Sequence, residues 1–241
     1  MGQTSIQKAS NIIKPRMKKT QPLEVCTSLT SYTFPRLLRL KSYWRLIRVP
    51  LTSRKRLEAV SHILNVFDLE KDYKTKRNRE RLAKILDLVT GNSVLEVGCA
   101  TGYILNYVAS KKNIQESVGV DLNDGRLWVA KKKYPNSKFY KADLLSLPFS
   151  DKSFDTVLLP EILEHISQPK KALDEAIRIA KREVIITLPN ASKENYDKSL
   201  VEISEHKWYP TEEKVKSLLG NKKHEVHFTS NQDFMIIKIF V

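Results

Sequence analysis

Short apolar stretches alternate with segments of helical period from residue 93 to the end of the chain. This alternation is typical of an α/β fold, in which helices cover both faces of a largely parallel sheet. Strands are predicted at 93–98, 117–122, 138–142, 154–159, 183–188, 225–229 and 234–241. Helices are predicted near 102–111, 124–134, 169–181 and 211–219. The last two strands are close enough in sequence to form an antiparallel hairpin.

The N-terminal part of the chain has a different pattern. Residues 1–35 show no sustained period, and we expect them to be largely disordered. A short basic amphipathic helix is predicted at 36–49, because its apolar residues share one helical face: Leu37, Leu40, Trp44 and Ile47. Further helical patterns follow near 57–67 and 82–89. We therefore divide the chain into a basic N-terminal extension, residues 1–56, and a folded domain, residues 57–241.

The charge of the chain follows the same division. Residues 1–56 hold 13 of the 42 Lys and Arg residues and only one acid, Glu24, so they supply +12 of the formal net charge of +15. Residues 57–241 are nearly balanced, with 29 basic and 26 acidic residues. This balance weakens the case for a nucleic-acid-binding body, which usually carries its basic stripe on the fold.

Other features of the composition bound the class of protein. Two cysteines, Cys26 and Cys99, exclude a disulfide framework and a thiolate zinc site. No apolar segment near Met1 resembles a secretory signal, and no apolar run approaches the about 20 residues of a membrane-spanning helix. We expect a cytoplasmic protein. The alternative is the mitochondrial matrix, because the Arg-rich and acid-poor N-terminus also fits a transit peptide.

A glycine loop followed by an acid is the strongest candidate for a binding site. The strand at 93–98 breaks at Gly98, and a helix begins near Gly102, so a ligand can approach the backbone at a helix N-terminus. Asp121, at the end of the next strand, is placed to accept hydrogen bonds from ribose hydroxyls. The loop lacks the G-x-G-x-x-G pattern of dinucleotide sites, and Glu96 would repel a pyrophosphate. A carboxylate there suits the ammonium group of S-adenosylmethionine.

The stretch from about Lys76 to Val241 resembles the class I S-adenosylmethionine-dependent methyltransferases, and most closely their type 11 group. The segment Glu96–Gly102 is similar to the family's E/D-x-G-x-G-x-G loop, with Ala100 at the middle glycine. The resemblance implies a Rossmann-like sheet with the order 3-2-1-4-5-7-6. It also implies the residues that bind the cofactor: Glu96, Gly98, Ala100, Gly102, Asp121, Leu122, Asp143, Leu144 and Pro160.

The segment after the fourth strand should face the transferred methyl group, because ligands bind beyond the carboxyl ends of the central strands. On a helix Glu161, Glu164 and His165 would share a face. Glu161 and His165 are the candidate catalytic residues, with His165 as a general base. The E-x-x-E-H motif also resembles that of methyltransferases that bind Mg²⁺ or Mn²⁺. The metal-ligand candidates are Glu161, Glu164, His165 and His206. The alternative is a structural helix on which His165 only packs.

The predicted function is methyl transfer from S-adenosylmethionine to a small-molecule acceptor, with oxygen as the favoured acceptor atom. One alternative is an RNA methyltransferase that uses the basic N-terminal segment as a backbone clamp. Another is a partner protein that binds S-adenosylmethionine without catalysis. The segment 1–56 also fits an anionic membrane surface. The sequence leaves the acceptor and the oligomeric state open.

Overall fold

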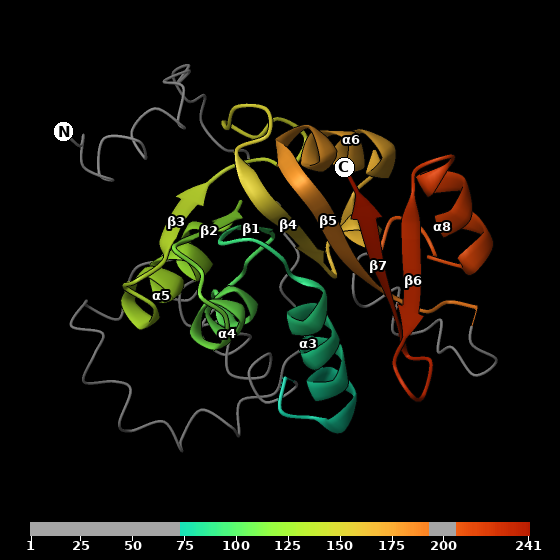
Figure 1. Cartoon of the computed structure of the whole chain (residues 1–241), viewed down its shortest axis with the longest axis horizontal. Coiled ribbons are helices and arrows are strands. Elements are labelled where there is room, and N and C mark those ends of the chain that lie inside the picture. The colour runs from blue at the N-terminus through green and yellow to red at the C-terminus, as the bar shows by residue number, and fades with distance from the viewer. Residues whose placement is uncertain (1–72, 193–205) are drawn as a thin grey trace, which may run out of the picture.

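A computed structural model describes residues 73–192 and 206–241. In these residues seven strands form one sheet with the order β3-β2-β1-β4-β5-β7-β6, and helices lie on both of its faces (Figure 1). The predicted α/β class, strand order and terminal hairpin are therefore confirmed.

The elements agree closely with those predicted from the apolar pattern. The strands are β1 (Ser93–Val97), β2 (Glu116–Asp121), β3 (Lys138–Lys141), β4 (Phe154–Pro160), β5 (Ala180–Pro189), β6 (His224–Phe228) and β7 (Phe234–Phe240). The helices are α3 (Lys76–Leu88), α4 (Tyr103–Lys111), α5 (Asp124–Lys133), α6 (Pro169–Ile179) and α8 (Glu212–Leu219), with a short 3₁₀ helix, η2 (Leu163–His165). Strand β5 begins earlier than predicted, because Ala180 already pairs with Phe154 of β4.

The central position of β1 determines where the chain can bind a ligand. Strand β1 pairs in parallel with β2 on one side and with β4 on the other. The chain therefore moves outward in opposite directions from β1 and β4, and this is the topological switch point of a doubly wound sheet. At the other end of the sheet, β7 lies antiparallel between β5 and β6.

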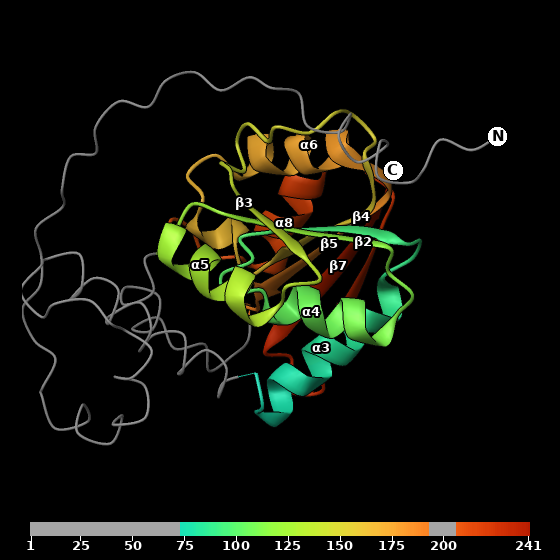
Figure 2. The same ribbon diagram turned by 90° about the vertical axis from the view of Figure 1, so that its left-hand side faces the viewer.

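Two hydrophobic clusters fill the space between the sheet and its helices. Helices α6 and α8 cover one face, and α3, α4 and α5 cover the other (Figure 2). Leu173 and Val215 belong to the first cluster, and Leu82, Leu105 and Leu127 belong to the second. Because both faces are covered, the central strands β1 and β4 are buried at every position.

Local sequence signals explain where several helices begin. The side chain of Asn123 accepts a hydrogen bond from the backbone N–H of Arg126 at 3.0 Å and caps α5. Thr211 caps α8 in the same way. Helix α6 begins with Pro169, which has no N–H to leave unpaired at the first position.

Two acids fix the turn that leads into β1. Asp155 accepts the N–H of Asn92 at 2.9 Å, and Glu183 accepts the N–H of Thr90 at 2.6 Å. Between them Gly91 has a φ of +75°, and a Cβ there would lie 2.4 Å from the Cβ of Asp155. Only glycine fits this turn. The start of β1 is thereby fixed relative to β4 and β5, and so is the loop at its other end.

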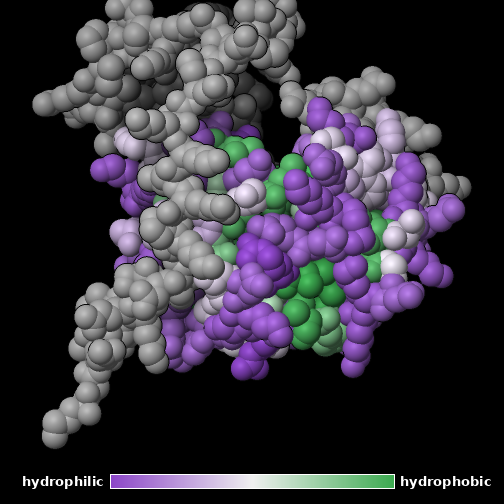
Figure 3. All heavy atoms as spheres, turned by 90° about the horizontal axis from the view of Figure 1, so that it is seen from above, coloured by the Kyte–Doolittle hydropathy of each residue, from purple (hydrophilic) through white to green (hydrophobic). Residues whose placement is uncertain are grey.

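Most of the described surface seen from above is hydrophilic, with smaller hydrophobic areas between the polar side chains (Figure 3). None of the helices in the described ranges is long and apolar enough to cross a membrane. The predictions of disorder in 1–35, of helices near 36–49 and 57–67, and of a domain boundary at 56/57 lie outside the described residues.

Candidate functional site

The glycine loop after β1 is a tight turn packed against two neighbouring segments. The backbone N–H groups of Gly98 and Cys99 both donate to the carbonyl of Val120, at 2.8 and 2.9 Å. Gly98 and Gly102 have φ values of +73° and +78°. A Cβ on Gly98 would lie 2.9 Å from Ile162, and one on Gly102 would lie 2.7 Å from Phe139. Both glycines are therefore required by the turn itself, before any ligand binds.

Ala100 occupies a position that favours glycine. Its φ is +46°, in the left-handed region, where an alanine is strained by about 1–2 kcal/mol. The family loop has glycine at this point, so the departure noted in the sequence has a measurable cost.

We expect Ala100→Gly to raise the free energy of unfolding by about 0.5–1 kcal/mol, because relief of strain outweighs the added chain entropy. Urea unfolding monitored by circular dichroism measures this change. Ala83→Gly, at an exposed position inside α3, is the matched control and should lower the free energy of unfolding by about 1 kcal/mol. A loss of stability in both variants would contradict the strain argument.

Asp121 lies at the end of β2 beside this loop. One carboxylate oxygen accepts the N–H of Ala100 at 2.9 Å, and the other accepts the N–H of Asn123 at 2.8 Å. Each oxygen keeps a second lone pair, so the carboxylate can still accept ribose hydroxyls. The next residue, Leu122, is 60% exposed beside it, an apolar surface on which an adenine ring could pack.

Two further predicted cofactor-binding residues, Asp143 and Leu144, lie beyond β3. The carboxylate of Asp143 is exposed and accepts the N–H of Leu145 at 2.9 Å. The side chain of Leu144 is buried in the core cluster under α6. Its backbone, rather than its side chain, is what remains available to a ligand.

Glu96 has a structural partner that the sequence did not predict. Its side chain is buried in β1, and one oxygen accepts the N–H of Leu105 in the first turn of α4 at 2.8 Å. Burial raises the pKa of Glu96 to about 8; the N–H of Leu105 opposes this shift, and the nearby charge of Asp121 adds to it. The carboxyl group thus holds α4 against β1 and is protonated more readily than an exposed glutamate.

The helix predicted to begin after β4 is absent, and this prediction is wrong. Strand β4 continues through Pro160, and Glu161 follows in a left-handed conformation with a φ of +49°. The N–H of Glu161 donates to the carbonyl of Thr187 in β5 at 3.0 Å, which keeps the chain on the sheet. Only the single 3₁₀ turn of η2 follows. Glu161, Glu164 and His165 therefore do not share a helical face.

Glu161 instead forms a partly buried ion pair with Arg81 of α3. Its carboxylate lies 3.3 Å from the guanidinium of Arg81 and accepts the hydroxyl of Thr187 at 3.1 Å. Arg81 is 3% exposed, and its guanidinium also stands over the ring of Phe234, 4.5 Å from the centroid. Burial raises the pKa of Glu161, and the charge of Arg81 opposes that rise. Arg81 is a site residue that the sequence analysis missed; its position on the buried face of α3 was the available signal.

Glu164, His165 and His206 come together in what we call the acid–histidine cluster. Their ligand atoms all lie within 4.8 Å of one another, and the two imidazole centroids are 4.7 Å apart. A hydrogen bond of 2.7 Å from the N–H of Lys207 to the carbonyl of Glu164 holds the two segments together. Trp208 adds a second, from its indole N–H to the carbonyl of Leu163. Glu161 lies outside the cluster.

The cluster contains polar atoms that are buried without a partner. They are one carboxylate oxygen of Glu164, whose side chain is 1% exposed, and Nδ1 of His206. Burial and the charge of Glu161 raise the pKa of Glu164, whereas burial and the nearby His165 lower the pKa of His206. A neutral imidazole beside an unsatisfied carboxyl oxygen can take up a proton or hold a cation.

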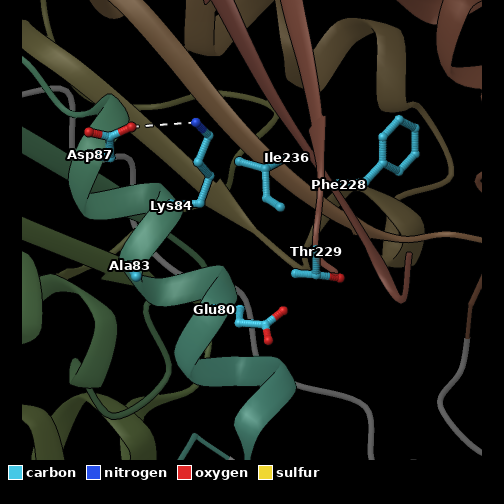
Figure 4. A pocket seen from close by; sticks show the side chains of 7 residues that line it. All are labelled: Glu80, Ala83, Lys84, Asp87, Phe228, Thr229 and Ile236. Carbon is cyan, nitrogen blue, oxygen red and sulfur yellow. Dashed lines mark hydrogen bonds and ion pairs between the residues drawn. The ribbon is translucent and has the colours of Figure 1, made fainter. Parts of the chain in front are cut away.

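A separate open hollow of about 390 Å³ lies between α3 and the β6–β7 hairpin (Figure 4). It is lined by Glu80, Ala83, Lys84, Asp87, Phe228, Thr229 and Ile236. None of the predicted cofactor, catalytic or metal residues lines it, so we do not assign it to the same site.

Comparison with known proteins finds relatives that are methyltransferases. Residues 95–188 match the family described as "Methyltransferase domain". The chain is 35% identical over 107 residues to a demethylmenaquinone methyltransferase of Renibacterium salmoninarum, a match that covers 44% of each chain. It is 29% identical over 105 residues to the ubiquinone/menaquinone biosynthesis C-methyltransferase UbiE of Campylobacter jejuni, covering 42% of this chain and 45% of that protein.

Solved structures share the fold. One of them, an S-adenosylmethionine-dependent methyltransferase from Aquifex aeolicus, superposes with a TM-score of 0.57 at 20% identity. That match covers 71% of this chain and 96% of the other. The chain spans less than half the length of the curated relatives it matches. Residues 95–188 are thus similar to methyltransferase domains, and the sheet has the fold of a solved S-adenosylmethionine-dependent methyltransferase.

Proposed function

We propose that the chain transfers a methyl group from S-adenosylmethionine to a small molecule with a hydroxylated ring. The observation that carries this proposal is the acid–histidine cluster, in which Glu164 and His165 belong to the segment that follows β4. Because β4 pairs with β1, this cluster and the glycine loop follow adjacent parallel strands at the same edge of the sheet. A proton acceptor and a cofactor loop at one switch point are what methyl transfer to an acidic hydroxyl requires.

The residues of the loop fit the cofactor. Asp121 would bind the ribose hydroxyls, Leu122 and Asp143 would contact adenine, and the carboxyl group of Glu96, two residues before Gly98, would attract the ammonium group. When bound, S-adenosylmethionine supplies a methyl group that its positively charged sulfur has already activated. The chain then has to align the acceptor, exclude water and remove a proton.

His165 and His206 are the groups proposed to remove that proton. The lowered pKa of His206 keeps its imidazole neutral near pH 7, so that it can accept a proton from a phenol. The resulting phenolate is nucleophilic at oxygen and at the adjacent ring carbon. One base therefore serves O-methylation, which the sequence analysis favoured, and C-methylation, which the name of the Campylobacter relative states.

A divalent cation is the alternative role of the same cluster. Glu164, His165 and His206 offer one carboxylate and two imidazole ligands, a set suited to Mn²⁺ or, less closely, Mg²⁺. A cation there would lower the pKa of the acceptor hydroxyl instead of removing its proton directly. No relative named above points to a metal, so we keep the general base as the primary assignment.

We expect Asp121→Ala to weaken binding of S-adenosylhomocysteine by about 1.5–3 kcal/mol, because it removes hydrogen bonds to a charged acceptor. Isothermal titration calorimetry measures this loss. Asp124→Ala, three residues further along, removes an exposed acid and should leave the affinity unchanged. Wild-type protein that binds NAD but neither S-adenosylmethionine nor S-adenosylhomocysteine would overturn the cofactor assignment.

The acceptor is tested separately with methyl-labelled S-adenosylmethionine. A catechol and a demethylated quinol are supplied in parallel, and mass spectrometry locates the label on oxygen or carbon. Transfer to either ring supports the proposal. Transfer only to RNA, or cofactor binding without transfer to any acceptor, contradicts it.

A further inference from the structure

The excess basic charge of residues 57–241 is concentrated in one segment, which lies at one edge of the sheet. Residues 122–141, which contain α5 and β3, hold six of the 29 Lys and Arg residues of 57–241 but only one of its 26 acids. The rest of that range therefore has a small acidic excess. Strand β3 is the outermost strand of the sheet, and α5 lies at the outer end of its helical layer (Figure 2).

An exposed tryptophan lies in the middle of this basic region. Trp128 is 56% exposed, whereas its neighbours Leu127 and Ala130 are buried against the sheet. Lys131 and Lys132 follow Trp128 by three and four residues, so all three side chains lie on the same outward face of α5. We call these three residues the α5 face.

The lysines of the α5 face have no acidic partners in the described part of the chain. Lys141 pairs with Asp124 at 2.6 Å, and Lys138 pairs with Glu116 at 3.5 Å. No ion pair between described residues includes Lys131 or Lys132. Their charges are therefore directed to solvent, next to a large aromatic ring that is also in solvent.

We propose that the α5 face binds an anionic lipid surface. Tryptophan favours the boundary between lipid headgroups and hydrocarbon, and each lysine near an anionic bilayer strengthens binding. A bilayer surface can be bound by the exposed face of one helix with a single aromatic anchor. A single-stranded nucleic acid instead requires a groove that follows its backbone and several stacking rings.

Binding to a bilayer would determine where the domain acts and not which group it transfers. Helix α5 begins three residues after Asp121, so a bilayer bound to the α5 face would lie within one helix length, ~15 Å, of the candidate cofactor site. An apolar acceptor dissolved in the bilayer could then reach the domain without crossing water. The test below measures binding alone, so its result is independent of the proposed methyl transfer.

The experiment is co-sedimentation of the full-length chain with phosphatidylcholine vesicles, with and without phosphatidylserine, at physiological ionic strength. The variants are W128A and the double charge reversal K131E/K132E. The matched control is K214E/K216E, which makes the same charge change at exposed positions of α8 on the opposite face of the sheet. Melting temperature with S-adenosylhomocysteine confirms that each variant is folded.

We expect wild-type protein to bind the anionic vesicles and not the neutral ones. K131E/K132E should weaken binding at least about tenfold and W128A by about fivefold, with K214E/K216E within about twofold of wild type. Equal losses in the two double variants would overturn the proposal, because net charge or the N-terminal extension would then carry the binding. If K131E/K132E binds lipid as well as wild type but binds RNA more weakly, the α5 face is a nucleic-acid surface and the proposal is overturned.

Discussion

His165→Ala is expected to lower the rate of methyl transfer by about 10²–10⁴-fold while leaving the affinity for S-adenosylhomocysteine unchanged. The reason is that His165 lies in the acid–histidine cluster, where an unpartnered carboxyl oxygen and two imidazoles meet. Single-turnover assays with labelled cofactor measure the chemical step directly. His224→Ala, on the edge strand β6, is the matched control and should retain the wild-type rate.

A chelator separates the two roles proposed for the cluster. If His165 acts as a base, the rate is unaffected by chelator, rises with pH through a histidine pKa, and falls only mildly in Glu164→Gln. If the cluster binds a cation, the rate is lost in chelator and restored by Mg²⁺ or Mn²⁺, and Glu164→Gln is as damaging as His165→Ala. Full activity in both variants would show that the cluster is structural and that alignment alone carries the reaction.

The fold could be predicted from the sequence because its main signals are local. The inner strands β4 and β7 are mainly apolar runs between polar or helical segments, and both are buried along nearly their whole length. The glycine loop and Asp121 could also be found, since both lie at strand ends that the pattern locates. The strand order, in contrast, was predicted from the family resemblance and not from the periodicity of apolar residues.

The segment after β4 could not be predicted, because its conformation depends on residues far away in sequence. A helix at 161–165 satisfied every local rule. The N–H of Glu161, however, pairs with Thr187 and its carboxylate with Arg81, so the chain stays on the sheet. His206 completes the cluster although it follows His165 by 41 residues. It lies near His165 because the chain returns to pass beside η2.

In the structure the buried carboxyl group of Glu96 holds α4, and in the proposed function the same group attracts the ammonium group of the cofactor. We expect the stability of the ligand-free protein to fall by about 2 kcal/mol between pH 6 and pH 8 through this residue. The pKa of Glu96 is about 8 in the folded protein and near 4.5 in the unfolded chain. The folded state therefore keeps a proton that the unfolded chain has lost, so stability falls as pH rises through this window.

Urea unfolding across this range measures the slope, and Glu96→Gln, which does not titrate, isolates the contribution of Glu96. The glutamine variant should have a shallower slope and should exceed the wild type in stability most clearly at pH 8. Equal slopes in the two proteins would show that the carboxyl group ionises normally despite its burial.

Cofactor affinity should depend on pH in the opposite direction. An ammonium group beside Glu96 favours its ionised form, so S-adenosylhomocysteine should bind up to about tenfold more tightly at pH 7 than at pH 6. 5′-Methylthioadenosine contains the adenosine and sulfur but no ammonium group, and its affinity should not change. If the two ligands show the same pH dependence, Glu96 serves only to hold α4 through the N–H of Leu105. If they differ as expected, the buried acid that costs stability in the empty domain is also the group that recognises the cation.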